Sequence, residues 1–88
     1  MGELVETEYV CRVCGLVQPD PAWEDGFGSF DICACCGTEF GYQDTMPEGV
    51  RAVREDWRAR GYPWADPKRR PVDWDVRAQL ANIPARWR

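Results

Sequence analysis

Two pairs of cysteines carry the strongest chemical signal in this sequence. Cys11 and Cys14 belong to one C-x-x-C-G turn, and Cys33 and Cys36 belong to a second. Residues 15–32 separate the pairs, which is within the spacing range of four-cysteine zinc sites. A C-x-x-C turn presents two sulfurs to one ion at about 2.3 Å, and two such turns complete a tetrahedron. The sequence therefore predicts one metal ion bound by these four thiolates.

The fifth cysteine, Cys35, is adjacent to Cys36 and cannot form the same turn with it. We expect Cys35 to be a partly buried spectator thiol beside the cluster, with a reactive thiol as the alternative. Disulfides are the alternative for the whole set. However, five cysteines are an odd number, and the acidic residues 1–6 lack a signal-peptide or myristoylation pattern. We therefore expect a reduced, cytoplasmic chain.

The identity of the metal is less constrained than its ligands. Tetrahedral sulfur suits both zinc and iron. Two C-x-x-C-G turns in a small, acidic, aromatic-rich chain also resemble rubredoxins, which use iron for single-electron transfer. A minimal rubredoxin has no place for the long basic, tryptophan-bearing segment that follows the second turn. We therefore expect one structural Zn²⁺, with a rubredoxin-like iron carrier as the alternative.

Length and composition exclude several classes of protein. The chain has 88 residues, 44% of them hydrophobic, which suits a single domain over residues 1–88. No apolar run approaches the roughly 20 residues that a membrane helix needs. Histidine is absent, and four thiolates leave a zinc ion no open position for water. We therefore expect a non-enzymatic protein.

Charge is distributed unevenly along the chain. Residues 1–48 hold ten acidic residues against Arg12 alone, whereas residues 49–88 hold five acidic and ten basic residues, giving the net charge of −4. An acidic half disfavours a phosphate backbone, and a basic half favours one. The simplest interpretation is that the two halves attract each other within one fold.

The elements that position the cysteines are predicted to be short hairpins. Strands are expected on either side of each turn, with the second turn flanked by residues 29–32 and 38–42, and a loop is expected over residues 18–29. Two hairpins sharing one ion form a zinc ribbon over residues 8–44. The predicted fold is thus a small metal-bound α+β protein, a zinc ribbon followed by two C-terminal helices.

An amphipathic helix is predicted over residues 45–61. Thr45 and Glu48 match a capping box, and Gly61 is a natural stop. Apolar residues recur on one face, which we expect to pack on the ribbon: Met46, Val50, Val53 and Trp57.

Residues 62–88 are predicted to form an extended segment and then a short helix. Asp73 is its expected N-cap, and Val76, Leu80 and Ile83 share a side. The five tryptophans are expected to divide between core and surface. Trp57 and Trp74 are expected in the core, and Trp64 and Trp87 at the surface.

A resemblance covers most of the chain. Residues 30–44 read Phe-Asp-Ile-Cys-Ala-Cys-Cys-Gly-Thr-Glu-Phe-Gly-Tyr-Gln-Asp, and this is similar to the cysteine-rich CPCC type of small bacterial proteins. The likeness continues through residues 54–57, 61–64 and 74–80. Arg12 and Ala34 depart from it, because proline commonly follows the first cysteine there. The resemblance implies a zinc ribbon and no activity.

These observations favour a protein-interaction module of the adaptor or immunity type. Its partner would be a protein, met through arginines and exposed tryptophans, and the candidate surface residues are Arg51, Arg54, Arg58, Trp64, Arg69, Arg70 and Trp87. The alternative use of the same surface, together with Lys68, is RNA binding. The sequence does not define the oligomeric state.

Overall fold

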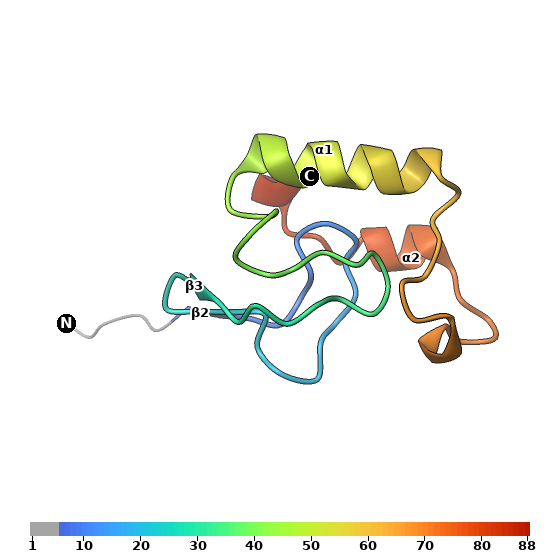
Figure 1. The fold of residues 1–88 in the computed structure, drawn as a ribbon, viewed down its shortest axis with the longest axis horizontal. Helices are drawn as coiled ribbons and strands as arrows, with labels where there is room; N and C mark the ends of the chain where they lie inside the picture. Colours follow the sequence, from blue (N-terminus) through green and yellow to red (C-terminus); the bar gives the residue numbers. More distant parts are fainter. Residues whose placement is uncertain (1–5) are drawn as a thin grey trace.

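A computed structural model describes residues 6–88 (Figure 1). The expectations for the extreme N-terminus, that it carries neither a signal peptide nor a myristoylation site, concern residues that lie largely outside this range. The elements follow in the order β1 (Thr7–Glu8), β2 (Trp23–Glu24), β3 (Phe27–Gly28), α1 (Pro47–Ala59), the 3₁₀ helix η1 (Pro67–Arg69), α2 (Val76–Leu80) and the 3₁₀ helix η2 (Ala85–Trp87).

The sheet has three antiparallel strands in the order β1-β2-β3. Trp23 of β2 lies opposite Glu8 of β1 and Gly28 of β3. The loop predicted over residues 18–29 is therefore wrong in part. Each strand has two residues, too short for an alternating pattern to be visible. The usable signal was Asp25-Gly26, since both have positive φ (54° and 84°), as a tight hairpin turn requires.

Each metal turn is closed by a single β-bridge. Val10 pairs with Val17 around the first turn, and Ile32 pairs with Glu39 around the second. The strands predicted at residues 29–32 and 38–42 are reduced to this one bridge. The coarse prediction of a small α+β protein with two helices and a cysteine cluster is confirmed.

Helix α1 begins two residues later than the predicted start. Its N-cap is Met46, with no side-chain cap, so the Thr45–Glu48 capping box is wrong. Pro47 explains the difference, because proline holds the preceding residue in the extended region and itself suits the first helical turn. The stripe expected to face the ribbon is buried at Val50 and Trp57, whereas Met46 is exposed.

The C-terminal part also departs from its predicted caps. Helix α2 is capped by Asp75 and not by Asp73, since the Asp75 carboxylate accepts hydrogen bonds from the backbone of Arg77 and Ala78. The helix η1 lies within the segment expected to be extended. Ile83 is buried, and Val76 and Leu80 pack against the core as predicted.

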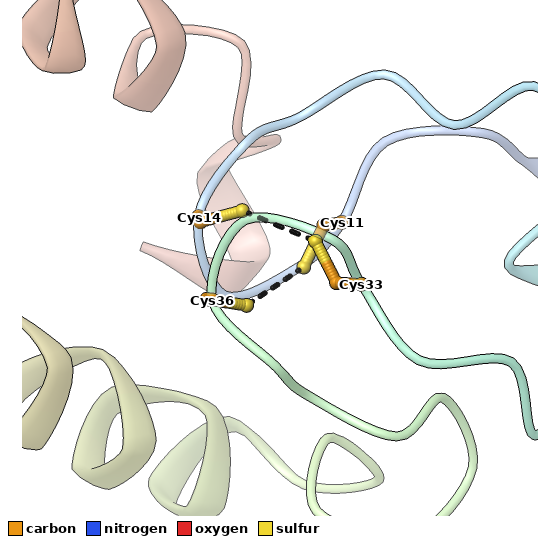
Figure 2. A group of neighbouring side chains, drawn as sticks. All are labelled: Cys11, Cys14, Cys33 and Cys36. Atoms are coloured by element: carbon orange, nitrogen blue, oxygen red, sulfur yellow. Dashed lines mark hydrogen bonds between the residues drawn. The ribbon is translucent and has the colours of Figure 1, made fainter. Parts of the chain in front are cut away.

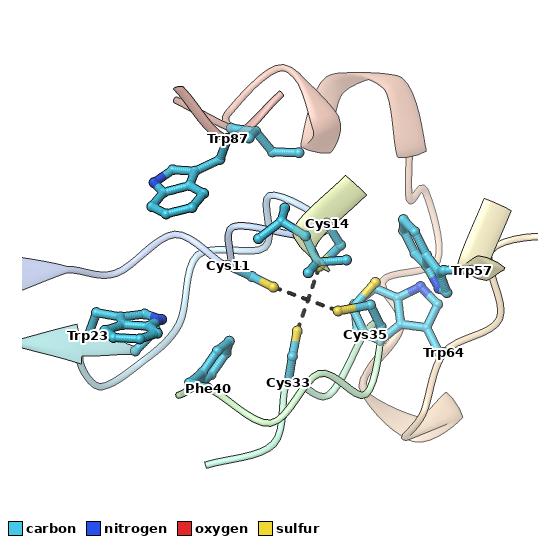
Figure 3. Packing of buried hydrophobic residues seen from close by; sticks show 14 residues of the cluster. Cys11, Cys14, Trp23, Cys33, Cys35, Phe40, Trp57, Trp64 and Trp87 are labelled. Atoms are coloured by element: carbon cyan, nitrogen blue, oxygen red, sulfur yellow. Dashed lines mark hydrogen bonds between the residues drawn. The ribbon is translucent and has the colours of Figure 1, made fainter. Parts of the chain in front are cut away.

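The core is centred on the cysteines (Figure 3). Helix α1 lies across the loops that carry the metal turns, and α2 lies below its C-terminal half (Figure 1). Phe40, Val50 and Trp57 are fully buried around the sulfurs. In residues 6–88 no helix combines the length and the apolar composition that crossing a membrane demands.

Candidate metal centre

The structure brings four cysteine sulfurs into one group (Figure 2). The Sγ atoms of Cys11, Cys14, Cys33 and Cys36 all lie within 4.8 Å of one another. The Cys11–Cys36 and Cys14–Cys33 sulfur distances are both 3.6 Å. Four metal–sulfur bonds of 2.3 Å in a tetrahedron place neighbouring sulfurs about 3.8 Å apart. The four thiols are thus positioned to hold one metal ion.

The two turns have the same backbone. Gly15 donates its N–H to the Cys11 carbonyl, and Gly37 donates to the Cys33 carbonyl, both at 2.9 Å. Gly15 and Gly37 have φ values of 86° and 81°, in the left-handed region that favours glycine. The glycine after each C-x-x-C pair thus closes the turn.

Burial and hydrogen bonding shift the pKa values of the clustered thiols in opposite directions. Burial raises the pKa of Cys11 far above its usual value, whereas hydrogen bonds with Cys11 and Cys14 lower the pKa of Cys33. All five cysteines are free thiols, so the disulfide alternative does not describe this structure. A divalent cation relieves the repulsion that four buried thiolates would otherwise suffer.

Two side chains form hydrogen bonds with sulfurs of the second turn. Thr38 Oγ1 lies 3.0 Å from Cys36 Sγ, and Gln18 Nε2 donates to Cys33 Sγ at 3.4 Å. When the cysteines are thiolates, both side chains donate, which orients the ligands and spreads their negative charge. The sequence analysis did not identify Thr38 or Gln18, because neither residue type is a typical metal ligand.

Cys35 lies outside the group of four. Its sulfur accepts a hydrogen bond from Gln79 Nε2 at 3.3 Å, and the same amide donates to the Cys14 carbonyl at 3.1 Å. Cys35 is fully buried, not partly buried as expected. Gln79, from α2, thus ties this thiol to the first metal turn.

Arg54 anchors the first turn to α1. Its guanidinium donates to the carbonyls of Val13 (2.7 Å), Arg12 (2.8 Å) and Trp87. Burial lowers the pKa of Arg54 from its usual value. The expectation that Arg54 belongs to an exposed surface is therefore wrong, because Arg54 is half-buried and its guanidinium binds these three backbone carbonyls.

The Arg12 side chain lies between two tryptophan rings. Its guanidinium carbon is 3.8 Å from the centroid of Trp23 and 3.9 Å from that of Trp87. Two 2.8 Å hydrogen bonds to the Glu8 carboxylate complete its contacts on one edge. Trp87 is only 7% exposed, so its predicted surface position is wrong. Stacking on Arg12 therefore buries Trp87, although its neighbours in sequence, among them a proline and an arginine, do not suggest a core position.

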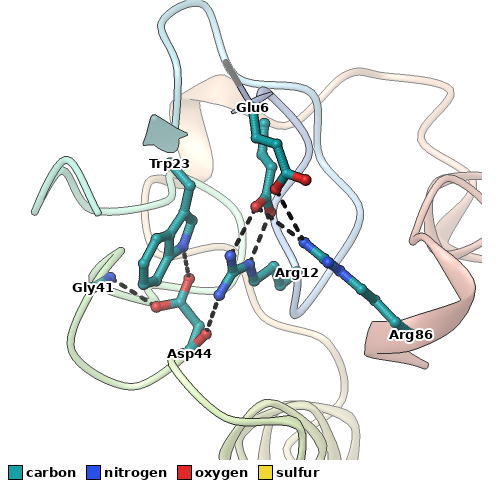
Figure 4. A network of polar contacts seen from close by, with 7 residues as sticks. Glu6, Arg12, Trp23, Gly41, Asp44 and Arg86 are labelled. Carbon is teal, nitrogen blue, oxygen red and sulfur yellow. Dashed lines mark hydrogen bonds and ion pairs between the residues drawn. The ribbon is translucent and has the colours of Figure 1, made fainter. Parts of the chain in front are cut away.

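A buried carboxylate braces the same region. Asp44 Oδ2 accepts a hydrogen bond from Trp23 Nε1 (2.9 Å), and Oδ1 accepts one from the Gly41 backbone (2.7 Å). The Asp44 carbonyl accepts from Arg12 at 2.8 Å (Figure 4). Asp44 is thus a structural acceptor that fixes the segment after the second turn.

Trp64 is also buried, at 9% exposure, against the surface prediction. It packs edge-on against Trp74, with ring centroids 5.4 Å apart. Burial of Trp64 and Trp87 leaves the RNA-binding alternative without two of its expected stacking platforms. Four of the candidate surface residues do lie exposed, namely Arg51, Arg58, Arg69 and Arg70.

Comparison with known proteins gives one match of limited extent. The chain is 44% identical over 45 residues to the uncharacterized protein YoaQ of Bacillus subtilis (strain 168). The match covers 47% of this chain and 37% of that relative, so the chain spans little more than a third of the relative's length. No family model and no solved structure matches.

Proposed function

We propose that this chain is a small, non-enzymatic zinc protein of the zinc-ribbon type, in which one structural Zn²⁺ holds together a surface for another protein. The observation that carries the proposal is the buried group of four sulfurs within 4.8 Å. It is a closed set of ligands, because four thiolates fill the tetrahedral positions of zinc. The proposed relationship to CPCC-type proteins agrees with such a site and adds no activity.

The surroundings of the sulfurs support a structural role. Arg54, Gln79 and Asn82 bind carbonyls of the first turn from elements that come much later in the chain. A metal ion that fixes both turns therefore also fixes the docking of α1 and α2. Because a small domain buries limited apolar surface, such a cross-link contributes a large part of its stability.

Iron is the second candidate for the same ligands. Hydrogen bonds to ligand sulfurs, such as those from Thr38 and Gln18, are among the features that set the reduction potential of iron–thiolate centres. A red or brown, redox-active protein after purification from iron-replete cells would favour the rubredoxin-like alternative.

Metal analysis tests the proposal directly. We expect one zinc per chain by elemental analysis and a colourless protein. Cys33→Ser should abolish stoichiometric binding, whereas Cys35→Ser is the matched control, since Cys35 lies outside the group of four. Binding should weaken as pH falls, because protons compete with the metal for thiolates. Full zinc occupancy in the Cys33→Ser protein, or none in the wild type, would contradict the proposed site.

A further inference from the structure

Large apolar side chains are exposed along the arms of the two metal turns. Val17, which follows the first turn, is 59% exposed, and Ile32, which precedes the second, is 64% exposed. Phe27 and Phe30, earlier in the segment that leads to Ile32, are 77% and 64% exposed. Clustered exposed apolar residues mark surfaces for binding partners more often than single ones do.

Val17 and Ile32 line a groove of about 410 Å³. Its other walls include Pro19 and the buried Trp64, and two carboxylates belong to it, Asp20 and Asp31. A neighbouring hollow of about 350 Å³ contains Phe27 with Glu24 and Asp25. The segment 27–32 joins the two hollows. We call the first of them the acidic groove.

The charges around the acidic groove have few counter-charges. Within residues 6–88, none of Asp20, Asp31, Glu24 and Asp25 forms an ion pair. Arg69, contributed by η1, is the one cation in the groove lining of the described chain. A zinc ion bound by four thiolates beside the groove would add a net charge of about −2. A cationic ligand is therefore favoured on the side of the two aspartates.

We propose that the acidic groove binds a short basic amphipathic segment of a partner protein. Aliphatic side chains of that segment would lie against Val17 and Ile32, and its lysines or arginines would lie by Asp20 and Asp31. Nucleic acid and anionic membrane surfaces do not fit, because their phosphates carry the same sign of charge as the groove. This interface shares Trp64 and Arg69 with the surface predicted from the sequence but none of the other candidate residues.

The inference rests on the proposed function through the metal turns. Val17 pairs with Val10 across the first turn, and Ile32 pairs with Glu39 across the second. An ion that joins the two turns would therefore set the spacing of the two groove walls. Loss of the metal should remove the groove together with its binding.

The test uses the zinc-loaded 88-residue protein and a short fluorescein-labelled peptide of alternating lysine and leucine. A peptide with glutamate in place of lysine is the charge-reversed control. We expect saturable binding of the lysine peptide that weakens as salt is raised, and no binding of the glutamate peptide. Equal binding of both peptides, or none of the lysine peptide, would overturn the proposal.

Paired variants locate the interface. Asp20→Asn with Asp31→Asn should weaken binding about tenfold at low salt, whereas Asp66→Asn with Asp73→Asn, which makes the same change of charge outside the groove, should change it less than about twofold. Val17→Ser with Ile32→Ser should weaken it as well, and Tyr42→Ser, at an exposed position outside the groove, should not. Equal effects in a pair and its control would exclude this groove.

Spectroscopy on the wild-type protein makes the result independent of variant folding. Amide NMR shifts induced by the lysine peptide should be largest at residues 17–20 and 30–34 and smallest on α1. Shifts centred on α1 would overturn the groove. Elemental analysis separates the two proposals. A zinc-loaded protein that shows no such shifts refutes the groove alone. A metal-free protein that shows them refutes the zinc site and the dependence of the groove on the ion, but not the groove itself.

Discussion

The two metal turns share a backbone but differ in what packs on them. The first turn is covered by later parts of the chain: Arg54 of α1 binds the Val13 carbonyl, Gln79 of α2 binds that of Cys14, and Asn82 binds that of Gly15. The second turn is contacted mainly by backbone groups. The backbone N–H groups of Ala65 and Asp66 donate to the carbonyls of Cys35 and Ala34. The group of four sulfurs requires the two turns to be alike. The residues that pack on each turn differ, so the two turns place different constraints on the sequence.

The glycines show this difference most clearly. A Cβ atom on Gly15 would lie 2.0 Å from the Gln79 carbonyl oxygen. A Cβ atom on Gly37 would meet only the Ala65 side chain, at 3.5 Å, an ordinary contact. Gly15 is thus required by its backbone conformation and by packing, whereas Gly37 is required by its conformation alone.

Metal removal should unfold both turns together, because both are expected to depend on one ion. We expect a strong chelator under reducing conditions to abolish cooperative thermal unfolding, since a structural zinc contributes on the order of 10 kcal/mol. Circular dichroism and calorimetry measure this. Re-addition of zinc should restore the transition. A melting curve that is unchanged by the chelator would mean that packing alone holds the turns.

Alanine at the two glycines should separate the turns. Gly37→Ala is expected to lower the free energy of unfolding by about 1–2 kcal/mol, the cost of a side chain at positive φ. Gly15→Ala adds the collision with α2 and is expected to cost more than about 4 kcal/mol or to prevent folding. Urea titration of the zinc-loaded proteins gives both values. Equal losses would show that α2 does not constrain the first turn.

Removing the Arg54 anchor should weaken the first turn without touching the ligands. Arg54→Met leaves three carbonyls without this donor, and we expect a loss of about 2–3 kcal/mol. Arg51→Met, an exposed change on the same helix, is the control and should stay within about 0.5 kcal/mol. Denaturant midpoints, together with zinc content, distinguish lost anchoring from lost metal. A neutral Arg54→Met would contradict the anchoring role.

The smallest effect is expected at the second turn. Thr38→Val removes the hydroxyl beside Cys36 Sγ at nearly constant volume. We expect a loss of about 1 kcal/mol in the free energy of unfolding and a modest decrease in zinc affinity, measured by competition with a chromophoric chelator. Leu16 is the equivalent residue of the first turn and has no hydroxyl. The Thr38→Val variant therefore tests a hydrogen bond that only the second turn has.

The sequence predicted the local parts of this site and missed those that depend on distant neighbours. Cysteine spacing and the following glycines identify both turns, because the chemistry of the turn is contained in adjacent residues. The positions of Trp64 and Trp87 were wrong, since neither lies in a regular apolar pattern. Trp87 is buried because Arg12, far away in sequence, stacks on it. The prediction of Thr45 as N-cap was wrong because Pro47 holds Met46 in the extended region and thereby makes Met46 the N-cap.

Because Arg12 lies between Trp23 and Trp87, the intrinsic fluorescence of these two tryptophans should report on the first metal turn. Two indoles from opposite regions of the chain touch a side chain that belongs to the first metal turn. Opening of that turn should expose both rings to water and shift their emission to longer wavelength. Intrinsic fluorescence of Trp23→Phe and Trp87→Phe variants can then follow metal loading in real time without any added dye.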